Sequence, residues 1–197
     1  MKIMLHACCG PCLLEPYDAL AASHDVRVVY ANPNIHPARE YERRRDTLLA
    51  YAEERGIAVD VLPYAPVAWD DAVRGMETAP PERCRACFRL RLGMVARHAG
   101  VEGFDAVATT LTVSPYQDPE VIRSAGEEAC AAEGVGFLVT DFRDRYPEAV
   151  RRSRELGMYR QSFCGCRYSK AEADTERQRR KAERLRSRAQ REGPSRG

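Results

Sequence analysis

Short apolar runs alternate with helix-like segments along most of this chain. We expect strands in five runs, at residues 2–7, 26–31, 58–63, 104–111 and 135–142. We expect helices at about 12–22, 38–55, 85–98, 120–133 and 149–157, and a last helix after Cys166. Strands alternating with helices favour βαβ units and a mainly parallel sheet. The pattern therefore predicts an α/β protein with a single-domain Rossmann-like (nucleotide-hydrolase-like) layered fold and a C-terminal helical extension.

The chain is long enough for one ordinary domain, because its 197 residues are 44% hydrophobic. We expect that domain at residues 1–170 and a basic, helical or disordered tail at 171–197. From Lys170 to Gly197 there are ten Lys/Arg and five Asp/Glu, about +5, which leaves about −3 for the rest of a chain whose net charge is +2. A basic tail is typical of nucleic-acid contact, and a solvated or disordered end fits equally well.

The sequence also indicates a compartment. Residues 1–9 lack the features of a signal peptide, and no apolar run approaches the ~20 residues needed to span a bilayer. We therefore expect a cytoplasmic protein with no membrane partner. In a reducing compartment its eight cysteines are metal-binding or catalytic rather than a disulfide framework.

Seven of the eight cysteines fall into three groups. The groups are Cys8, Cys9 and Cys12, then Cys84 and Cys87, then Cys164 and Cys166. A disulfide between the neighbours Cys8 and Cys9 would be strained. Cys130 stands alone in a helical pattern, where we expect a small buried residue.

The cysteine count favours an iron–sulfur protein. One structural zinc ion takes four ligands, and a redox-active dithiol or disulfide needs a single C-x-x-C pair. A [4Fe–4S] cluster takes up to four thiolates, which leaves about three thiols for a second metal, a redox pair or packing. Structural zinc, redox-active thiols and inert thiols remain open alternatives, because iron and zinc both accept thiolates.

Three unusual loops each follow an expected strand. They are HACCGPC (6–12), ANPNIHP (31–37) and TTLTVSPY (109–116). The carboxyl ends of parallel strands lie at one edge of a sheet, so these loops predict one convergent site. Neither G-x-x-x-x-G-K-[ST] nor G-x-G-x-x-G follows the first strand, which counts against an ATP- or NAD-dependent enzyme.

Six separated motifs resemble the epoxyqueuosine reductase family QueH. They are LHACCGPC, YANPNIHPAREYERR, RCRACFRLRL, TTLTVSPYQ, DFR and YRQSFCGCRYS, between about Lys2 and Lys170. The resemblance implies two-electron removal of the epoxide oxygen from epoxyqueuosine in tRNA, the last step of queuosine formation. It also implies a [4Fe–4S] cluster with an adjacent mononuclear iron, and no cobalamin. METAPPERC (76–84) departs from the acidic, glycine-rich lead-in expected before RCxxCF.

Site residues follow from the motifs. We expect Cys8, Cys9, Cys12, Cys84, Cys87, Cys164 and Cys166 to supply both metals, with no division between cluster and iron. Asp141 is a candidate iron ligand or proton relay, and a helix cap or loop hydrogen bond is the alternative. His36 is a candidate proton donor, with a turn hydrogen bond as the alternative. Tyr116 is expected to stack on a base, donate its hydroxyl, or pack in its loop.

Several weaker expectations concern substrate contact. We expect substrate contact, or a role in shaping the turn, for Tyr159, Arg160 and Gln161. We expect contact with tRNA, or exposure to solvent, for Glu40, Arg43 and Arg44. His6 packs or hydrogen-bonds rather than ligating metal. The candidate phosphate partners are Arg83, Arg85, Arg89 and Arg91, with Arg177, Arg179, Arg180 and Lys181 adding nonspecific attraction.

The expected partners are a tRNA carrying epoxyqueuosine in its anticodon loop and an unidentified electron donor. One rival function is another iron–sulfur tRNA-modifying enzyme, such as a thiolase adding sulfur to a base. That enzyme would normally use ATP, so the missing phosphate loop counts against it. The other rival is a zinc-bound RNA-binding module, which would be colourless rather than brown.

Overall fold

A five-stranded parallel sheet forms the centre of the molecule. The computed structural model describes the backbone of residues 1–191 and the side chains of residues 1–187. The strands are β1 (Lys2–His6), β2 (Asp25–Tyr30), β3 (Val59–Val61), β4 (Ala106–Thr109) and β5 (Gly136–Phe137). Their order is β3–β2–β1–β4–β5, and each neighbouring pair is parallel. The predicted α/β class and Rossmann-like layering are confirmed.

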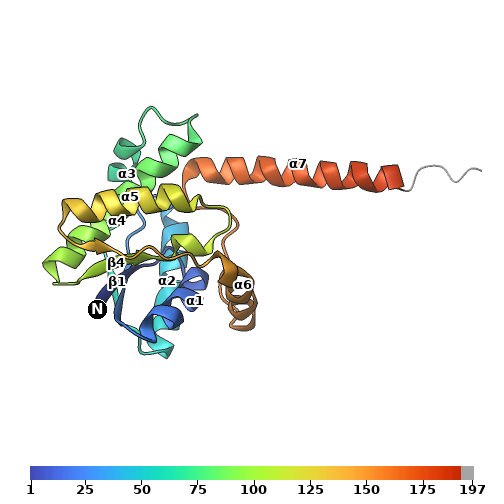
Figure 1. The fold of residues 1–197 in the computed structure, drawn as a ribbon. Helices are drawn as coiled ribbons and strands as arrows, with labels where there is room; N and C mark the ends of the chain where they lie inside the picture. The colour runs from blue at the N-terminus through green and yellow to red at the C-terminus, as the bar shows by residue number, and fades with distance from the viewer. Residues whose placement is uncertain (192–197) are drawn as a thin grey trace, which may run out of the picture.

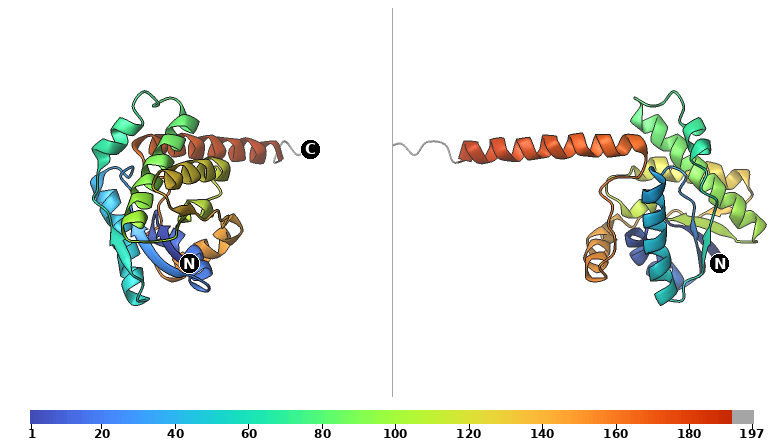
Figure 2. Two further views of the ribbon diagram at one scale, coloured as in Figure 1. Left: turned by 60° about the vertical axis from the view of Figure 1, so that its left-hand side comes forward. Right: turned by 180° about the vertical axis from the view of Figure 1, so that it is seen from behind.

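Helices cover both faces of the sheet (Figure 1). They are α1 (Gly10–Ala21), α2 (Ala38–Glu54), α3 (Pro66–Ala72), α4 (Pro80–Val101), α5 (Pro119–Ala132), α6 (Tyr146–Glu155) and α7 (Arg167–Arg191), with 3-10 turns at Thr110–Val113 and Arg143–Arg145. α1, α2 and α6 lie on one side, and α4 and α5 lie on the other (Figures 1 and 2). This is the layered arrangement of a doubly wound fold.

Alternating side chains of β1 fill the two cores. Ile3 and Leu5 pack with Leu13 and Leu48 of α1 and α2, whereas Met4 packs on the α4 side of the sheet. All three strand residues are fully buried. A parallel sheet buries both faces, which explains why Ile3, Met4 and Leu5 are apolar at consecutive positions rather than alternating with polar residues.

Two expectations about element length were wrong. The expected 135–142 strand pairs only over Gly136–Phe137, and Leu138 N–H donates the last ladder bond, to Val107 O over 2.8 Å. Its partner β4 ends at Thr109, where the chain turns into a 3-10 helix, so no further edge is available. The helix expected from Arg85 begins at Pro80, and α3 was not expected at all.

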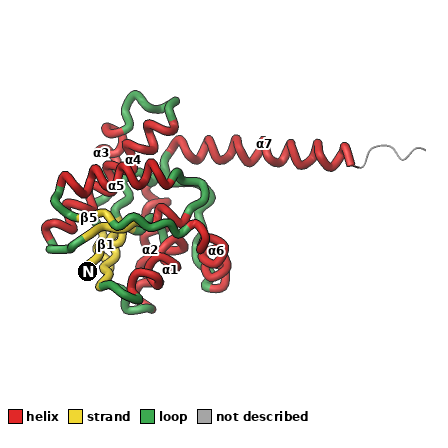
Figure 3. The backbone as a smooth tube through the Cα atoms, in the orientation of Figure 1, coloured by secondary structure: helices red, strands yellow, loops and turns green. Residues whose placement is uncertain are grey.

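The last helix extends far from the rest of the structure. α7 runs from Arg167 to Arg191 and leaves the side of the molecule as one continuous helix (Figures 2 and 3). Up to residue 191 the expected tail is therefore helical, and residues 192–197 lie outside the described part. Within the described residues no helix is both long and apolar enough to cross a membrane.

Candidate metal centre

The first cysteine group lies where β1 turns into α1. The sheet order reverses between β1 and β4, and ligand sites of such folds lie at this switch point, outside the carboxyl ends of the strands. The sulfur atoms of Cys8, Cys9 and Cys12 all lie within 4.8 Å of one another. Cys9 is buried, and the other two are half-buried. The first turn therefore presents three soft ligands to one point.

Hydrogen bonds between the three thiols shift the pKa values of Cys8 and Cys12 in opposite directions. Hydrogen bonds from Cys12 and then Cys9 hold the pKa of Cys8 well below its ordinary value, although burial opposes the shift. The same interaction with Cys8 raises the pKa of Cys12. Thr110 also donates its hydroxyl to the Cys8 sulfur over 3.5 Å. Cys8 is therefore the first thiolate of the group, and thiolates are the form that binds metal.

The second group lies on the first two turns of α4. Cys84 and Cys87 are three residues apart, so both occupy one face of the helix. Cys87 is buried and packs with Trp69, Val73 and Cys166. Burial, followed by the neighbouring charge of Cys87, raises the pKa of Cys84 to about 11. A bound cation would be needed to hold these thiols as thiolates at neutral pH.

The third group is held against the loop after β2. Gly165 has φ +126°, and a Cβ there would lie 2.9 Å from Ile35 Cγ1 and 3.0 Å from Arg44 Nη1. His36 N–H donates to Gly165 O over 2.9 Å. Arg44 donates to the carbonyl oxygen of Cys164 over 2.9 Å. The Cys–Gly–Cys sequence thus needs glycine for both its conformation and its close packing.

The second and third groups lie together. Cys166 packs with Cys87, and burial raises the pKa of Cys164 to about 12, with a further contribution from the charge of Cys87. Segments from α4 and from the turn before α7 therefore meet. The division of the seven thiols between metals is not tested by this geometry.

Arg91 connects the three groups. It is 1% exposed and donates from Nη2 to Asn32 Oδ1 over 2.6 Å. Its charge lowers the pKa values of Cys87 and Cys164 against the larger effect of burial, and adds to the hydrogen bonds that lower that of Cys8. Its Nε and Nη1 atoms are buried and have no partner among the described residues. Sequence reasoning placed Arg91 at a phosphate, which its burial excludes.

The other three candidate phosphate partners near the second cysteine group differ in exposure. Arg83 is 2% exposed and pairs with Glu172 over 2.5 Å, so it is also removed from a phosphate. Arg85 and Arg89 are exposed and lie 3.6 and 3.2 Å from Glu128. Only this second pair fits the expected surface role.

Gln161 was expected to contact substrate or shape its turn, and it contacts the thiols. Its Nε2 donates to the Cys9 sulfur over 2.8 Å. Nearby, Tyr159 donates its hydroxyl to Glu40 over 2.8 Å, and Arg43 stacks on the Tyr159 ring at 3.7 Å. These contacts hold the segment before Cys164 against α2. Arg160 is exposed.

Arg44 and His6 belong to the interior. Arg44 was expected to meet tRNA or solvent, but it is 2% exposed and its Nε pairs with Glu40 over 2.7 Å. His6 contacts Thr109 Oγ1 at 2.9 Å and Ala31 O at 3.2 Å, as expected for a packed residue. Burial, with a contribution from Arg91, lowers the pKa of His6 to about 3.

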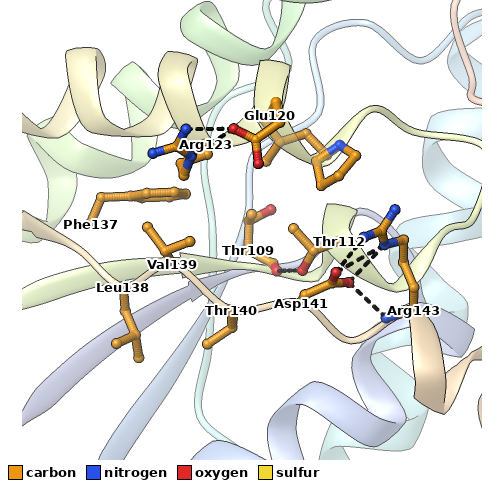
Figure 4. Close-up of a pocket in the computed structure, with 12 residues that line it drawn as sticks. Thr109, Thr112, Glu120, Arg123, Phe137, Leu138, Val139, Thr140, Asp141 and Arg143 are labelled. Carbon is orange, nitrogen blue, oxygen red and sulfur yellow. Dashed lines mark hydrogen bonds and ion pairs between the residues drawn. The ribbon is translucent and has the colours of Figure 1, made fainter.

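Asp141 is an ion-paired loop residue. It accepts hydrogen bonds from the Arg143 backbone N–H (3.1 Å) and guanidinium (2.5 Å) (Figure 4). The guanidinium holds the pKa of the Asp141 carboxyl below its ordinary value. Asp141 also lines a cavity of about 100 Å³ beside Thr112 and Arg123, at the carboxyl edge of the sheet.

His36 and Tyr116 follow β2 and β4 at the same edge. The His36 ring packs on Trp69 at 5.3 Å, and its Nε2 is buried without a partner among the described residues. Burial, and then the charge of Arg167, lowers the pKa of His36. Tyr116 is 71% exposed and meets Tyr146 edge-on at 6.3 Å. Most of the Tyr116 side chain is therefore exposed at the surface.

Four contributors were not expected from the sequence. Asn32 fixes Arg91, Thr110 contacts Cys8, Trp69 packs on Cys87, and Arg91 itself lies among the thiols. Asn32 lies in the ANPNIHP loop, which was the available signal, whereas nothing in the Trp69 region indicated a site. Cys130 is 1% exposed in the core, as expected, and burial raises its pKa to about 12.

Comparisons with known proteins agree with this arrangement. A family model described as epoxyqueuosine reductase QueH matches residues 3–172. A protein of that name from Streptococcus pyogenes serotype M1 is 35% identical over 178 residues, covering 85% of this chain and 70% of that protein. Another from Dehalococcoides mccartyi is 31% identical over 172 residues, covering 87% of this chain and 93% of that protein.

A solved structure shows the same fold. It is described as a predicted subunit of tRNA methyltransferase from Methanocaldococcus jannaschii, and it aligns with a TM-score of 0.52 and 12% identity. The alignment covers 79% of this chain and 75% of that one. Such low identity supports the architecture alone, whereas the relatives above support the family. The chain therefore belongs to the QueH family of epoxyqueuosine reductases.

Proposed function

We propose that this chain removes the epoxide oxygen of epoxyqueuosine in tRNA, giving queuosine, at a centre held by the three cysteine groups. Family membership supports the reaction. The observation that carries the location is the set of three sulfur atoms within 4.8 Å at the carboxyl end of β1. The conversion takes up two electrons and two protons, breaks both C–O bonds of the epoxide, and releases the oxygen as water.

Unsatisfied polar atoms around the thiols support a bound group. Buried atoms without a partner among the described residues include Arg91 Nε and Nη1, Gln161 Oε1, Trp69 Nε1 and His36 Nε2. Leaving such an atom unpaired costs about 1–3 kcal/mol, so several near one site call for an explanation. Most of them are donors, and thiolate or sulfide sulfur is an acceptor. The residues present therefore fit a sulfur-rich, anionic metal centre.

The seven thiols are the proposed ligands of a [4Fe–4S] cluster and a mononuclear iron. When bound, this pair would supply electrons one at a time and a Lewis acid for the epoxide oxygen. Arg91 balances part of the thiolate charge, and Gln161 holds the Cys9 sulfur in place. The electrons come from an external donor that the chain must meet at its surface.

Proton delivery is assigned to residues of the same edge. Among His36, Tyr116 and Asp141, the geometry favours His36 because its ring packs on Trp69, which in turn packs on Cys87 and Cys166. Its lowered pKa keeps the ring neutral near pH 7, so the ring would have to take up a proton before delivering one. Exposed Tyr116 is proposed to stack on a base of the anticodon loop. Asp141 would first have to leave Arg143.

A turnover assay tests the function. Anaerobically purified protein is incubated with a chemical reductant and tRNA carrying epoxyqueuosine, and the digested nucleosides are weighed by mass spectrometry. We expect epoxyqueuosine to be replaced by queuosine. Cys130→Ser provides a matched control for Cys9→Ser, because both thiols are buried but Cys130 lies outside the site. Iron-loaded protein that leaves the epoxide intact would contradict the proposal.

A further inference from the structure

α7 is a helical arm that leaves the candidate metal centre and continues beyond the family match. The family model ends at residue 172, whereas α7 continues to Arg191. Its first turns are fixed to the body. Arg83 pairs with Glu172 over 2.5 Å, and Arg177 donates to Ser162 O over 2.9 Å. Its 25 residues span about 37 Å at 1.5 Å per residue, so most of the arm stands clear of the body (Figure 2).

The charge of the outer arm exceeds what the helix itself needs. Residues 177–191 include only one acidic side chain, Glu183. The eight basic residues are Arg177, Arg179, Arg180, Lys181, Arg184, Arg186, Arg188 and Arg191. Ion pairs within the helix involve Arg177, Arg179 and Arg180. The helix dipole favours basic side chains only within the last turn, so the two effects together do not account for all the charges spread over four turns. The excess indicates a polyanionic partner.

The arm lacks the apolar stripe that a protein or membrane partner would require. Among its described side chains beyond Arg177, Leu185 is the one large apolar residue, and it is 59% exposed. A helix that packs on protein shows a broad apolar face, and a helix lying in a membrane interface carries several Trp, Phe or Leu side chains. A nucleic-acid backbone requires neither.

The basic residues also favour one face. Arg177, Arg180, Lys181 and Arg184 have the spacing i, i+3, i+4, i+7, which places them on one side of the helix. This side meets the body, because Arg177 contacts Ser162. Hydrogen bonding to Glu176 mainly raises the pKa of Arg180, and the nearby Tyr116 phenol adds to the shift. The basic face therefore begins where α7 leaves the body and continues outward.

We propose that this face of α7 binds the phosphate backbone of the tRNA, outside the loop that carries the reacting base. The inference rests on the proposed function, which makes tRNA the substrate. Guanidinium and ammonium groups at helical spacing bind phosphates without reading sequence, so the arm adds affinity and orientation rather than base specificity. The outer arm lies beyond the residues that the family model matches.

Two matched double variants test the proposal in the full-length, metal-loaded protein. Lys181→Gln with Arg184→Gln removes two charges from the basic face, and Arg179→Gln with Arg186→Gln removes two from the opposite face. Binding to an unmodified tRNA transcript is measured across a salt series. We expect the first variant to bind about three- to tenfold more weakly near 0.1 M salt, with the log–log salt slope reduced by about 1.5. The second should change affinity less than twofold.

Circular dichroism and iron content show whether either variant has lost structure. Equal effects of the two variants, or no effect of the first, would overturn the proposal. Native-level tRNA binding, together with lost binding to phosphatidylserine vesicles, would assign the face to a membrane instead. An unmodified transcript needs no reduction, so the two proposals separate. If the basic-face variant binds tRNA more weakly but the native protein does not convert epoxyqueuosine, only the reductase function is wrong. If the native protein converts epoxyqueuosine but the basic-face variant binds tRNA as tightly as the native protein, only this inference is wrong.

Discussion

Arg91 is held by Asn32 through a 2.6 Å hydrogen bond between two side chains that are each 1% exposed. Asn32 in turn donates to the carbonyl oxygen of Ala7, immediately before Cys8. The guanidinium is thus fixed at the start of the first cysteine group, with two nitrogen atoms left without a partner among the described residues. A fixed buried positive charge among thiols is an arrangement that stabilises added electrons as well as thiolates.

Replacing Arg91 with Gln should therefore make the centre harder to reduce. The variant loses one positive charge and the free N–H groups, so its midpoint potential should be more negative than that of the native protein. An anaerobic redox titration followed in the visible spectrum measures the shift. Arg89→Gln is the control, because Arg89 lies on the same helix with its side chain 64% exposed. If the midpoint potential of Arg91→Gln equalled that of the native protein, the Arg91 charge would not stabilise the reduced centre.

Gln161→Glu should loosen the metal centre. The isosteric change replaces the donor that contacts the Cys9 sulfur with a negative carboxylate. Changes of this kind beside metal ligands typically reduce metal affinity or activity about 10–100-fold. Iron loss to a chelator measures the effect. Gln178→Glu is the control, because it makes the same chemical change on the exposed surface of α7, and it should release iron at the native rate. If Gln161→Glu also released iron at the native rate, the contact with the Cys9 sulfur would not be needed to hold the metal.

Glycine substitutions should separate the Cys–Gly–Cys turn from ordinary helix. Gly165→Ala meets Ile35 and Arg44 at close range with φ +126°, so we expect a loss of about 1–3 kcal/mol and reduced iron content. Gly93→Ala lies inside α4, where a new Cβ meets nothing within 4 Å, and should stabilise the chain by up to about 1 kcal/mol. Thermal unfolding and metal analysis compare them. If Gly165→Ala and Gly93→Ala unfolded at the same midpoint temperature, the turn at Gly165 would not require glycine.

His6 should make stability depend on pH. Burial lowers its folded-state pKa to about 3, while the unfolded value is near 6.5, so the unfolded chain takes up a proton that the folded chain refuses. Its contribution is complete above about pH 6.5 and falls as pH drops, by about 2 kcal/mol at pH 5. His6→Asn removes the titration. The thermal unfolding midpoint of both proteins is measured as the pH is lowered. If the midpoint of the native protein fell no more steeply with pH than that of His6→Asn, His6 would not be neutral and buried in the folded protein.

The sequence pattern was informative wherever local chemistry decides structure. β-Branched runs and Gly/Pro boundaries predicted the parallel sheet and most helices. The position of three unusual loops after strands predicted that these loops meet, and side-chain contacts of Asn32 and Thr110 join them to the first cysteine group. The fifth strand was predicted too long because its length depends on where β4 ends, which is a property of the partner. Local propensity cannot report such a limit.

Burial of charged residues was the other point the sequence did not reveal. Arg44, Arg83 and Arg91 are ordinary helix residues in a charged stretch, and arginines are mostly exposed. Their burial depends on distant partners: the Cys164 carbonyl for Arg44, Glu172 for Arg83 and Asn32 for Arg91. Only the three-dimensional structure brings those partners close.

We propose that the clustered thiols hold an iron–sulfur centre. Anaerobic purification followed by iron, sulfide and zinc analysis and a visible spectrum tests it most directly. We expect brown protein, bleached by dithionite, with about five irons and four sulfides per chain, and loss of both in Cys9→Ser but not in Cys130→Ser. Colourless protein with one zinc and no sulfide would contradict it and make the cysteine groups a structural scaffold.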